Sequence, residues 1–321
     1  MIEIDSVFSI SNEQEFESRA LEVFNFQRQH CLVYRDYLTL LNRPEPNCIE
    51  EIPFLPISFF RTHKVMMQGE KVEKIFKSSG TTDSERSQHF LADLSIYKKS
   101  FEYAYRKFIG NPEEQVILAL LPNYLEQGDS SLVFMVDYLI HESKHDLSGF
   151  LLGDLAEVHE RYNMALEFNK KPVIIGVSYA LLDLAEKNFD FSKALVIETG
   201  GMKGRRKEMV KEELHELLQK GLNVSSIGSE YGMTELLSQA YSLENGIFQT
   251  PPWMKILIRD VYDPFLYETE GKIGGINVID LANIYSCSFI ATDDLGRKFG
   301  DQFSVSGRMD RSIQRGCNLL V

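Results

Sequence analysis

The chain of 321 residues lacks the features that define several large protein classes. Its four cysteines, Cys31, Cys48, Cys287 and Cys317, form no CxxC pair, so zinc-finger and dithiol redox motifs are absent. There is no run of about 18 uncharged apolar residues. The N-terminus also lacks a basic stretch followed by an apolar one. We therefore expect no membrane span, no secretory signal, and a cytoplasmic protein with free thiols.

Basic residues are also fewer than acidic residues. The chain has 34 Lys and Arg against 47 Asp and Glu, which gives a net charge of −13 and a pI near 5.1. Such an acidic surface argues against nucleic-acid binding. Among the seven histidines only His141 and His145 have the spacing of metal ligands on a helix, and no further ligands accompany them. Neither nucleic acid nor zinc is expected as a partner.

What is present is an alternation of helices and apolar strands. Continuous apolar segments at 116–122, 173–177, 194–199 and 223–228 predict strands. Helical patterns lie between and around them, at 97–109, 130–142, 153–169, 179–188 and 204–220, and a longer one covers 12–42. Strands that are apolar throughout indicate an α/β fold with mostly parallel sheets and helices on both faces.

After about residue 250 the pattern changes to short strands broken by Gly, Asp and Pro. This change predicts a smaller β-rich subdomain. The expected organisation is an α/β core over 1–250, the β-rich subdomain over 251–310, and a short tail over 311–321.

A loop rich in small hydroxyl residues precedes the alternating region. It contains Ser78, Ser79, Gly80, Thr81 and Thr82 and continues through charged residues to Arg86. Such a loop exposes backbone N–H groups and hydroxyl donors, which suit a phosphate. It lacks the glycine-to-lysine spacing of a Walker loop, and by itself it is equally compatible with an ordinary surface turn.

Two segments after predicted strands carry groups that suit a nucleotide. The first contains the paired glycines Gly200 and Gly201, followed by Met202. Such glycines let a flat ligand approach the backbone, or form a tight β–α turn. The second offers an aromatic face, a hydroxyl and a carboxylate that suits Mg²⁺, or forms a turn with a capping threonine. Its residues are Glu230, Tyr231, Gly232, Thr234 and Glu235.

Two more segments lie in the β-rich region. Asp293 and Asp294 stand at the predicted end of a strand, where one carboxylate suits the two hydroxyls of a ribose and an Asp-rich turn is the alternative. Arg308 suits a sugar hydroxyl or a phosphate, or belongs to a charged hairpin.

Together the five segments resemble the adenylate-forming superfamily of acyl-CoA synthetases and adenylation domains, in the same order along the chain. Across nearly its whole length the chain looks most like the acyl-protein synthetase branch, the fatty-acid ligases of bacterial bioluminescence. This similarity is carried by FKSSGTT, LALLPNYLEQGDSSLV, ETGGMKGRR, SEYGMTELLSQAY, PPWMK, CSFIATDDLGR and RGCNLL.

The resemblance implies an ATP- and Mg²⁺-dependent ligase with the fold of the superfamily's N-terminal domain. It implies that residues 78–82 grip the phosphates and that Gly200, Gly201 and Met202 border the adenine and acyl pocket. Tyr231 would stack on adenine, within the Glu230–Gly232 segment. Thr234 would contact phosphate, Glu235 would bind Mg²⁺, Asp294 (or Asp293) and Arg308 would hold the ribose, and Asp310 would mark a hinge.

The sequence departs from the superfamily pattern in two places. The phosphate loop continues as Asp83-Ser84-Glu85-Arg86-Ser87 instead of Gly-x-Pro-Lys-Gly, so Arg86 is expected to supply the charge. The sequence ends soon after Asp310, so the family's lid domain with its catalytic lysine is expected to be missing, which argues against coenzyme A ligase activity.

By the same resemblance, Cys317 is the expected acyl acceptor, and the neighbouring Arg315 favours the reactive thiolate. The alternative is a small apolar residue in a terminal strand, the interpretation that we also give to Cys287. The expected substrate is a fatty or other carboxylic acid, and the expected partner is an acyl reductase or acyl carrier. Two other functions stay open: an acyl- or aryl-CoA ligase that works with a partner, and a non-catalytic nucleotide-binding scaffold subunit.

Overall fold

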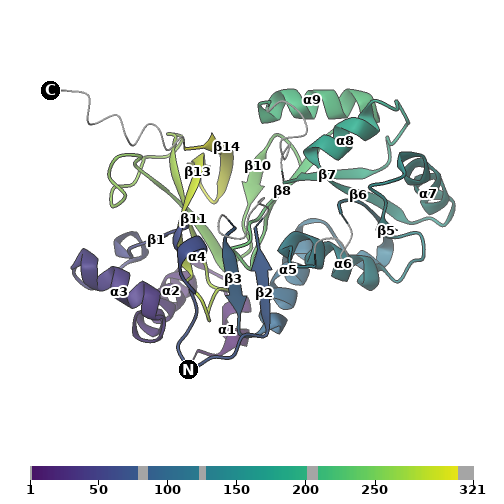
Figure 1. The fold of residues 1–321 in the computed structure, drawn as a ribbon. Coiled ribbons are helices and arrows are strands. Elements are labelled where there is room, and N and C mark those ends of the chain that lie inside the picture. Colours follow the sequence, from purple (N-terminus) through teal and green to yellow (C-terminus); the bar gives the residue numbers. More distant parts are fainter. Residues whose placement is uncertain (1, 79–85, 123–127, 201–208, 310–321) are drawn as a thin grey trace. The chain divides into compact units, whose positions relative to one another are not determined.

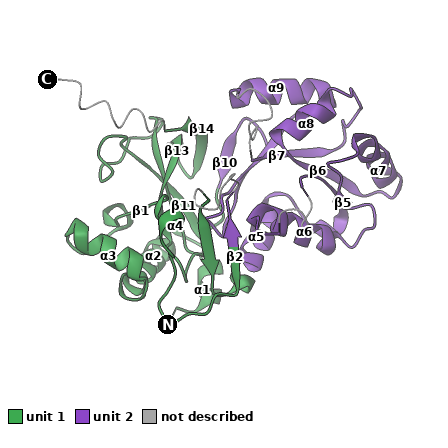
Figure 2. Ribbon diagram, viewed as in Figure 1, with its two compact units in different colours: residues 1–75, 80–96, 250–321 green, residues 76–79, 97–249 purple. Residues whose placement is uncertain are grey.

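The computed structural model describes residues 2–78, 86–122, 128–200 and 209–309 (Figure 1). The chain divides into two compact units, coloured separately in Figure 2. The first contains residues 1–75, 80–96 and 250–321, and the second contains residues 76–79 and 97–249. No helix of the described residues is long and apolar enough to cross a membrane. The predicted α/β class is confirmed, whereas the predicted domain limits at 250 and 310 stay a prediction.

The second unit is built on a mixed sheet whose strands follow the order β10-β9-β8-β7-β6-β4-β5. The pairs from β8 to β5 are parallel, and β9 and β10 are added antiparallel. Figure 1 shows α8 and α9 on one face of this sheet and α5 and α6 on the other. The strands are β4 (Gln115–Leu120), β5 (Gly149–Phe150), β6 (Lys171–Val177), β7 (Leu195–Thr199), β8 (Gly228–Tyr231), β9 (Ala240–Ser242) and β10 (Ile247–Gln249). The helices are α5 (Leu94–Phe108), η3 (Pro112–Glu114), α6 (Ser131–Ser143), α7 (Leu155–Glu167), α8 (Ser178–Ala185) and α9 (Lys211–Leu222).

Local sequence explains where these elements begin and end. Every residue of β4 is buried, as expected for a strand covered on both faces. The side chains of Ser130 and Asp154 accept backbone N–H groups in the first turns of α6 and α7. Lys144 and Asn223 end α6 and α9 in the left-handed conformation.

Two sequence-based predictions are wrong around α9. Of the helix predicted for 204–220, residues 204–208 lie outside the described residues, 209 and 210 are not helical, and α9 runs from Lys211 to Leu222. The strand predicted for 223–228 is instead β8, at Gly228–Tyr231. Asn223 stops the helix, and residues 224–227 connect it irregularly to the strand. Glu230 and Tyr231 therefore lie at the carboxyl end of a strand and do not follow one.

The first unit contains an antiparallel sheet in the order β11-β12-β13-β14, with β1 parallel to β13. This sheet agrees with the β-rich character predicted after residue 250. Its strands are β1 (Leu55–Pro56), β11 (Met254–Arg259), β12 (Gly274–Asp280), β13 (Phe289–Phe299) and β14 (Gln302–Arg308). β2 (Lys74–Lys77) and β3 (Gln88–Leu91) form a separate two-stranded sheet.

The N-terminal helices belong to this first unit. They are α1 (Ile4–Phe8), α2 (Glu13–His30), α3 (Leu32–Leu41), η1 (Ile49–Glu51) and α4 (Phe59–Thr62). The helical pattern predicted for 12–42 is confirmed, with a break at Cys31, whose backbone is extended. Phe24 and Tyr34 pack against Phe289 of β13 at ring-centroid distances of 6.1 Å. Cys287 is fully buried beside them, which confirms its interpretation as core.

Candidate active site

The carboxyl ends of β7 and β8 bring several polar side chains of the second unit together. The two strands are parallel and in register at Glu198 and Ser229. Ser178 follows β6, the next strand across, at its own carboxyl end. Residues from three separate segments therefore meet at one edge of the sheet, the place where ligands bind in open α/β folds.

Glu198 is the hub of this cluster and is only 5% exposed. It accepts hydrogen bonds from Ser178 Oγ at 2.5 Å and Ser229 Oγ at 3.4 Å, and Lys211 Nζ of α9 lies 3.3 Å from it. Burial and the Lys211 charge lower the pKa of His215, whose Nε2 lies 3.3 Å from Ser229 Oγ. Hydrogen bonds and one ammonium thus compensate a carboxylate taken out of water.

Glu230 is a second carboxylate in the same corner. Thr199 Oγ1 donates to its Oε2 at 2.6 Å. Burial, reinforced by the nearby charge of Glu198, raises the pKa of Glu230 to about 7, while Thr199 and Lys211 oppose the rise. A carboxyl group with a pKa near neutrality changes its charge in the physiological range and can hold or release a proton there.

Gly232 directly follows β8 and lies close to the side chains of Glu230 and Gln239. A Cβ on Gly232 would lie 2.3 Å from Glu230 Oε1 and 3.2 Å from Cγ of Gln239. Gln239 is 3% exposed, and its Oε1 has no hydrogen-bond donor among the described residues. A buried acceptor without a donor beside a glycine suits a ligand that carries N–H groups, as adenine does.

Tyr231 ends β8 and packs against β10. Its ring meets the Phe248 ring edge-on, with 5.9 Å between centroids, and Lys211 Nζ lies 5.0 Å from the Phe248 centroid. Tyr231 is 8% exposed, so a base would reach only a small part of its ring in this arrangement. Gly200 lies directly after β7 with φ of 76°, a conformation that favours glycine.

Thr234 and Glu235 lie in the turn between β8 and β9. Thr234 is partly exposed, and Glu235 is 5% exposed. No group of three or more His, Cys, Asp or Glu side chains in the described part of the chain is arranged to hold a metal ion. One carboxylate is nevertheless compatible with Mg²⁺ on a nucleotide, because this ion keeps several waters and takes ligands from substrate phosphates.

In the first unit the structure pairs Asp294 with Arg308. The two residues are opposite each other on β13 and β14, and Arg308 Nε donates to Asp294 Oδ1 at 3.2 Å. Asp294 is 8% exposed, whereas the Arg308 side chain is 83% exposed. Asp293, next to Asp294, points to the opposite face of the strand and is partly exposed. One ribose could therefore be held by only one of these two carboxylates.

A buried network fixes the backbone of Asp294. Its N–H donates to Thr292 Oγ1 at 3.1 Å, and this hydroxyl donates to the carbonyl of Ile276 at 2.8 Å. Arg259, 7% exposed, donates to the carbonyls of Thr292 and Ile276 at 2.6 and 2.8 Å. Contacts from β11 and β12 thus hold the backbone around Asp294.

The prediction that Asp293 and Asp294 end a strand is wrong. β13 continues through them to Phe299, and the chain turns at Gly300, where φ is 59°. Gly296, which suggested a turn, lies inside the sheet. A Cβ on it would lie 2.3 Å from the Ser304 carbonyl oxygen and 2.7 Å from Ile276 Cδ1, so close packing explains this glycine.

The other predicted residues lie at or beyond the edges of the described segments. Ser78 and Arg86 border the phosphate loop, and both are partly exposed. Ser79, Gly80, Thr81, Thr82, Gly201, Met202 and Cys317 lie outside the described residues.

Several members of the cluster were not predicted from the sequence. Ser178 and Lys211 lay in no motif, and Thr199 and Gln239 stood inside longer strings without a role of their own. Glu198 was noticed only as part of a glycine-containing string. A polar residue at the end of an apolar strand is the one signal that would have found Glu198 and Thr199.

Comparison with known proteins agrees with this architecture. A protein-family model described as "Acyl-protein synthetase, LuxE" matches residues 6–321. No curated protein sequence matches the chain.

Among solved structures, ATP-bound MatB from Rhodopseudomonas palustris is similar, with a TM-score of 0.56 and 16% identity over 74% of this chain and 48% of that one. An ATP-bound RpMatB-BxBclM chimera has a TM-score of 0.57 and 15% identity over 76% of this chain and 49% of that one. The chain thus spans about half the length of these relatives. The 2-hydroxyisobutyryl-CoA ligase in complex with 2-HIB-AMP and CoA has a TM-score of 0.64 and 12% identity over 93% of this chain and 68% of that one. At such identities the likeness shows the fold.

Proposed function

The chain belongs to the acyl-protein synthetase family LuxE, and on that premise we propose that it activates a fatty acid with ATP and transfers the acyl group to a protein thiol. The family match over residues 6–321 carries this proposal. The polar clusters at the ends of β7 and β8 and on β13 and β14 support it, because both offer groups that suit a nucleotide.

In the first step a carboxylate oxygen of the fatty acid attacks the α-phosphorus of ATP. The bond from this phosphorus to the bridging oxygen breaks, and pyrophosphate leaves with that electron pair. The protein has little proton transfer to perform, so its contribution is positioning and charge neutralisation. Mg²⁺, when bound, would supply positive charge to the phosphates.

Roles for individual residues follow from their chemistry and places. Tyr231 and Gly232 would face adenine near the Gln239 amide, and Glu230 would shape that edge. Thr234 would donate to phosphate and Glu235 would hold Mg²⁺. Asp294 would accept the ribose hydroxyls, with Arg308 beside it. The remaining phosphate and adenine contacts are assigned to Ser78, Ser79, Gly80, Thr81, Thr82, Arg86, Gly200, Gly201 and Met202.

In the second step the thiolate of Cys317 attacks the acyl carbon of the adenylate and AMP leaves, so a thioester forms. The acyl group would then pass to a partner, an acyl reductase or an acyl carrier. Coenzyme A is the competing acceptor, since the similar 2-hydroxyisobutyryl-CoA ligase was crystallised with it.

The test is the intact mass of the protein after incubation with ATP, Mg²⁺ and a panel of fatty acids. We expect a hydroxylamine-labile acyl adduct on the natural chain and none on Cys317→Ser. Cys48→Ser is the matched control, because Cys48 is the partly exposed cysteine of the described residues. Pyrophosphate release with no adduct on the natural chain or on Cys48→Ser would exclude Cys317 as the acceptor. Coenzyme A would then be tested directly. Nucleotide binding with no pyrophosphate release for any acid would point to a scaffold subunit.

A further inference from the structure

β13 carries a β-bulge at the residues that form the candidate ribose contact. Its pairing with β12 joins Leu295 to Gly275 and Ala291 to Asn277, and the register shifts between these two pairs. Three residues of β13, 292–294, therefore lie opposite one residue of β12. A bulge disrupts the ladder of hydrogen bonds and redirects the side chains of the bulged strand, and bulges are frequent beside active sites.

The Arg259 guanidinium binds the main chain at this bulge. It comes from the end of β11, and Arg259 is only 7% exposed. Its Nη2 donates to the Thr292 carbonyl at 2.6 Å, and its Nη1 donates to the Ile276 carbonyl and to Asn277 Oδ1, both at 2.8 Å. One planar, permanently charged group thus joins the bulge of β13 to β12 and supplies donors that buried carbonyls need.

The contact continues from Arg259 to Asp294 through a single residue. Thr292 accepts from Arg259 at its carbonyl, and its Oγ1 accepts the N–H of Asp294 at 3.1 Å. The guanidinium itself has little freedom to move, since a Cβ placed on Gly275 would lie 2.5 Å from its Cζ. The position of Asp294 therefore depends on a side chain that lies against the main chain of β12.

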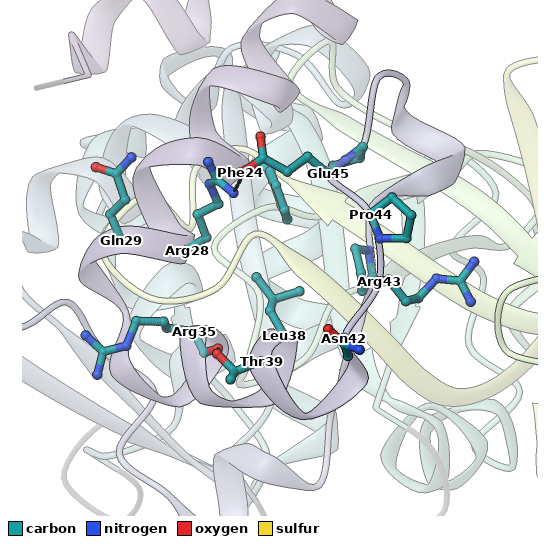
Figure 3. A pocket seen from close by; sticks show the side chains of 12 residues that line it. Phe24, Arg28, Gln29, Arg35, Leu38, Thr39, Asn42, Arg43, Pro44 and Glu45 are labelled. Atoms are coloured by element: carbon teal, nitrogen blue, oxygen red, sulfur yellow. Dashed lines mark hydrogen bonds and ion pairs between the residues drawn. The ribbon is translucent and has the colours of Figure 1, made fainter.

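This buried arginine differs from the arginines around a surface hollow of the same unit (Figure 3). The hollow has a volume of about 390 Å³ and is bounded by α2, α3 and the turn after α3. Arg28 is paired there with Glu45, and Figure 3 shows Arg35 and Arg43 pointing away from the hollow at its opposite ends. No described contact brings these three side chains together, whereas the donors of Arg259 all go to the strand pair at the bulge.

We propose that Arg259 is a positioning residue that directs Asp294 toward the sugar of the nucleotide and so sets the preference for ribose over deoxyribose. This inference rests on the proposed function, because it takes Asp294 as the acceptor of the ribose hydroxyls. Hydrogen bonds between oxygens need a distance of about 2.5–3.0 Å. A displacement of about 1 Å at the bulge therefore weakens the contact with the sugar.

The experiment is calorimetric titration of the full chain, with Mg²⁺, against ATP, 2′-deoxy-ATP and 3′-deoxy-ATP. We expect the natural chain to bind ATP about tenfold more tightly than the two analogues, since each lacks a hydroxyl that Asp294 accepts. Arg259→Met should weaken the binding of ATP by about tenfold and that of the analogues by less, so the preference for ATP falls. Arg259→Lys should restore part of this preference, because lysine keeps the charge but not the forked guanidinium.

Further variants separate positioning from general stability. Asp294→Asn should abolish the preference, and Arg259→Met added to it should change little more, because residues that act through one contact are not additive. Thr292→Val removes the hydroxyl between them and should also lower the preference. Arg297→Met is the matched control: Arg297 is an exposed residue of β13 that also donates to a carbonyl, that of Gly271, at 3.0 Å. It should leave the preference unchanged.

Thermal unfolding checks that each variant folds. An unchanged preference for ATP in the folded Arg259→Met protein overturns the inference, and so do additive losses in the double variant. Where Arg259→Met does not fold, Thr292→Val takes its place, and an unchanged preference there has the same meaning. Each of these results leaves the proposed function intact. A natural chain that binds no nucleotide contradicts the proposed function itself, and this inference with it.

Discussion

At the scale of single residues, Glu230 is where pH acts on the candidate site. Its pKa is raised to about 7 in the folded chain, against an ordinary 4.5, chiefly because the carboxyl is buried. The folded state therefore holds a proton that the unfolded chain releases near pH 4.5. Stability from this group is fully present below that pH and is lost as the pH rises through about 7.

Glu230→Gln should remove this dependence, since glutamine resembles the protonated acid at every pH. As the pH rises from 5 to 8, the natural chain should lose on the order of 2 kcal/mol of unfolding free energy that the variant keeps. One pKa unit is worth ~1.4 kcal/mol, and solvent screens part of the effect. Urea unfolding at both pH values measures it. Glu244→Gln, an exposed site in the same unit, should show no such gain. Parallel pH profiles of the Glu230→Gln and natural proteins would contradict the assignment.

Asp293 and Asp294 form a natural matched pair for testing the ribose contact. They are adjacent in sequence but on opposite faces of β13, and Asp294 accepts a hydrogen bond from Arg308. Asp294→Asn should raise the KM for ATP by roughly tenfold or more, because the variant loses a charged acceptor for the ribose hydroxyls. Asp293→Asn should leave KM nearly unchanged. Steady-state pyrophosphate release measures both, and the reverse ranking would move the ribose contact to Asp293.

The sequence identified motif residues better than their supporting partners. Tyr231, Gly232 and Asp294 stood in recognisable strings. Lys211 did not, since it reaches Glu198 only because α9 begins where it does. The contact between Gly232 and Glu230 likewise depends on how the Glu230 side chain folds back over it. Such contacts are set by packing and cannot be derived from spacing alone.

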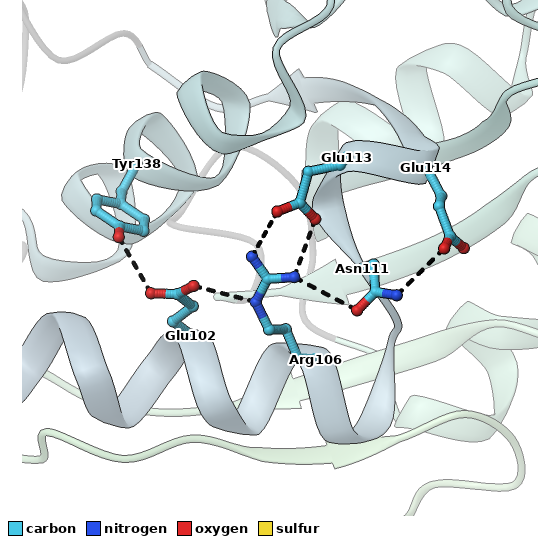
Figure 4. A network of polar contacts seen from close by, with 6 residues as sticks. All are labelled: Glu102, Arg106, Asn111, Glu113, Glu114 and Tyr138. Atoms are coloured by element: carbon cyan, nitrogen blue, oxygen red, sulfur yellow. Dashed lines mark hydrogen bonds and ion pairs between the residues drawn. The ribbon is translucent and has the colours of Figure 1, made fainter.

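At the scale of elements, one arginine joins three segments of the second unit (Figure 4). Arg106 of α5 donates to both oxygens of Glu113 in η3, at 2.9 and 2.8 Å, and to Glu102 at 3.0 Å. Tyr138 of α6 donates to the other Glu102 oxygen at 3.1 Å. The hydrogen bonds from Arg106 hold the pKa of Glu113 at about 2. This forked pair therefore stabilises the fold above the ordinary carboxyl pKa of 4.5, and its contribution is lost as the pH falls toward 2.

Arg106→Met should destabilise the protein by about 1 kcal/mol at pH 7, a modest effect because the pairs are partly exposed. The stability of Arg106→Lys should lie between those of the natural chain and Arg106→Met, since lysine keeps the charge but not the forked guanidinium. The neighbouring Lys107→Met, at an exposed position of the same helix, is the control and should be close to neutral. Chemical unfolding measures all three, and equal losses for Arg106→Met and Lys107→Met would show that the network contributes nothing.

Element types were predicted more reliably than element limits. Apolar strands such as β4 and β6 were recognised because they are buried along nearly their whole length. The strand was predicted too early, at 223–228, because Val224 and Ile227 look like strand residues. In the structure Asn223 stops α9 and residues 224–227 are irregular, so β8 begins later. The prediction ended β13 too early because Asp293, Asp294 and Gly296 resemble a turn, whereas the strand continues to Phe299. In both places tertiary packing overrode local preference.

At the scale of the whole molecule, the first unit is assembled from segments far apart in the sequence. This is difficult to predict because apolar periodicity reports only local structure. Gln27 of α2 illustrates the long-range connection. It is fully buried, and its Nε2 donates to the carbonyls of Asn283 and Ile284 and to Ser288 Oγ at 2.9 to 3.1 Å. The N–H of Ser288 donates back to Gln27 Oε1 at 2.9 Å.

Gln27→Leu should therefore be among the costly single changes in this unit. Leucine fills a similar volume but takes the Gln27 partner from the Ile284 carbonyl and the Ser288 N–H, at ~1–3 kcal/mol for each unsatisfied group. The Asn283 carbonyl keeps its hydrogen bond from the Ser286 N–H. We expect a loss of about 3 kcal/mol or more in the free energy of unfolding, measured in urea. Gln14→Leu, on the exposed side of the same helix, makes the same chemical change and should cost little. A small loss for Gln27→Leu would mean that apolar packing, not this polar contact, holds α2 to the segment at 283–288.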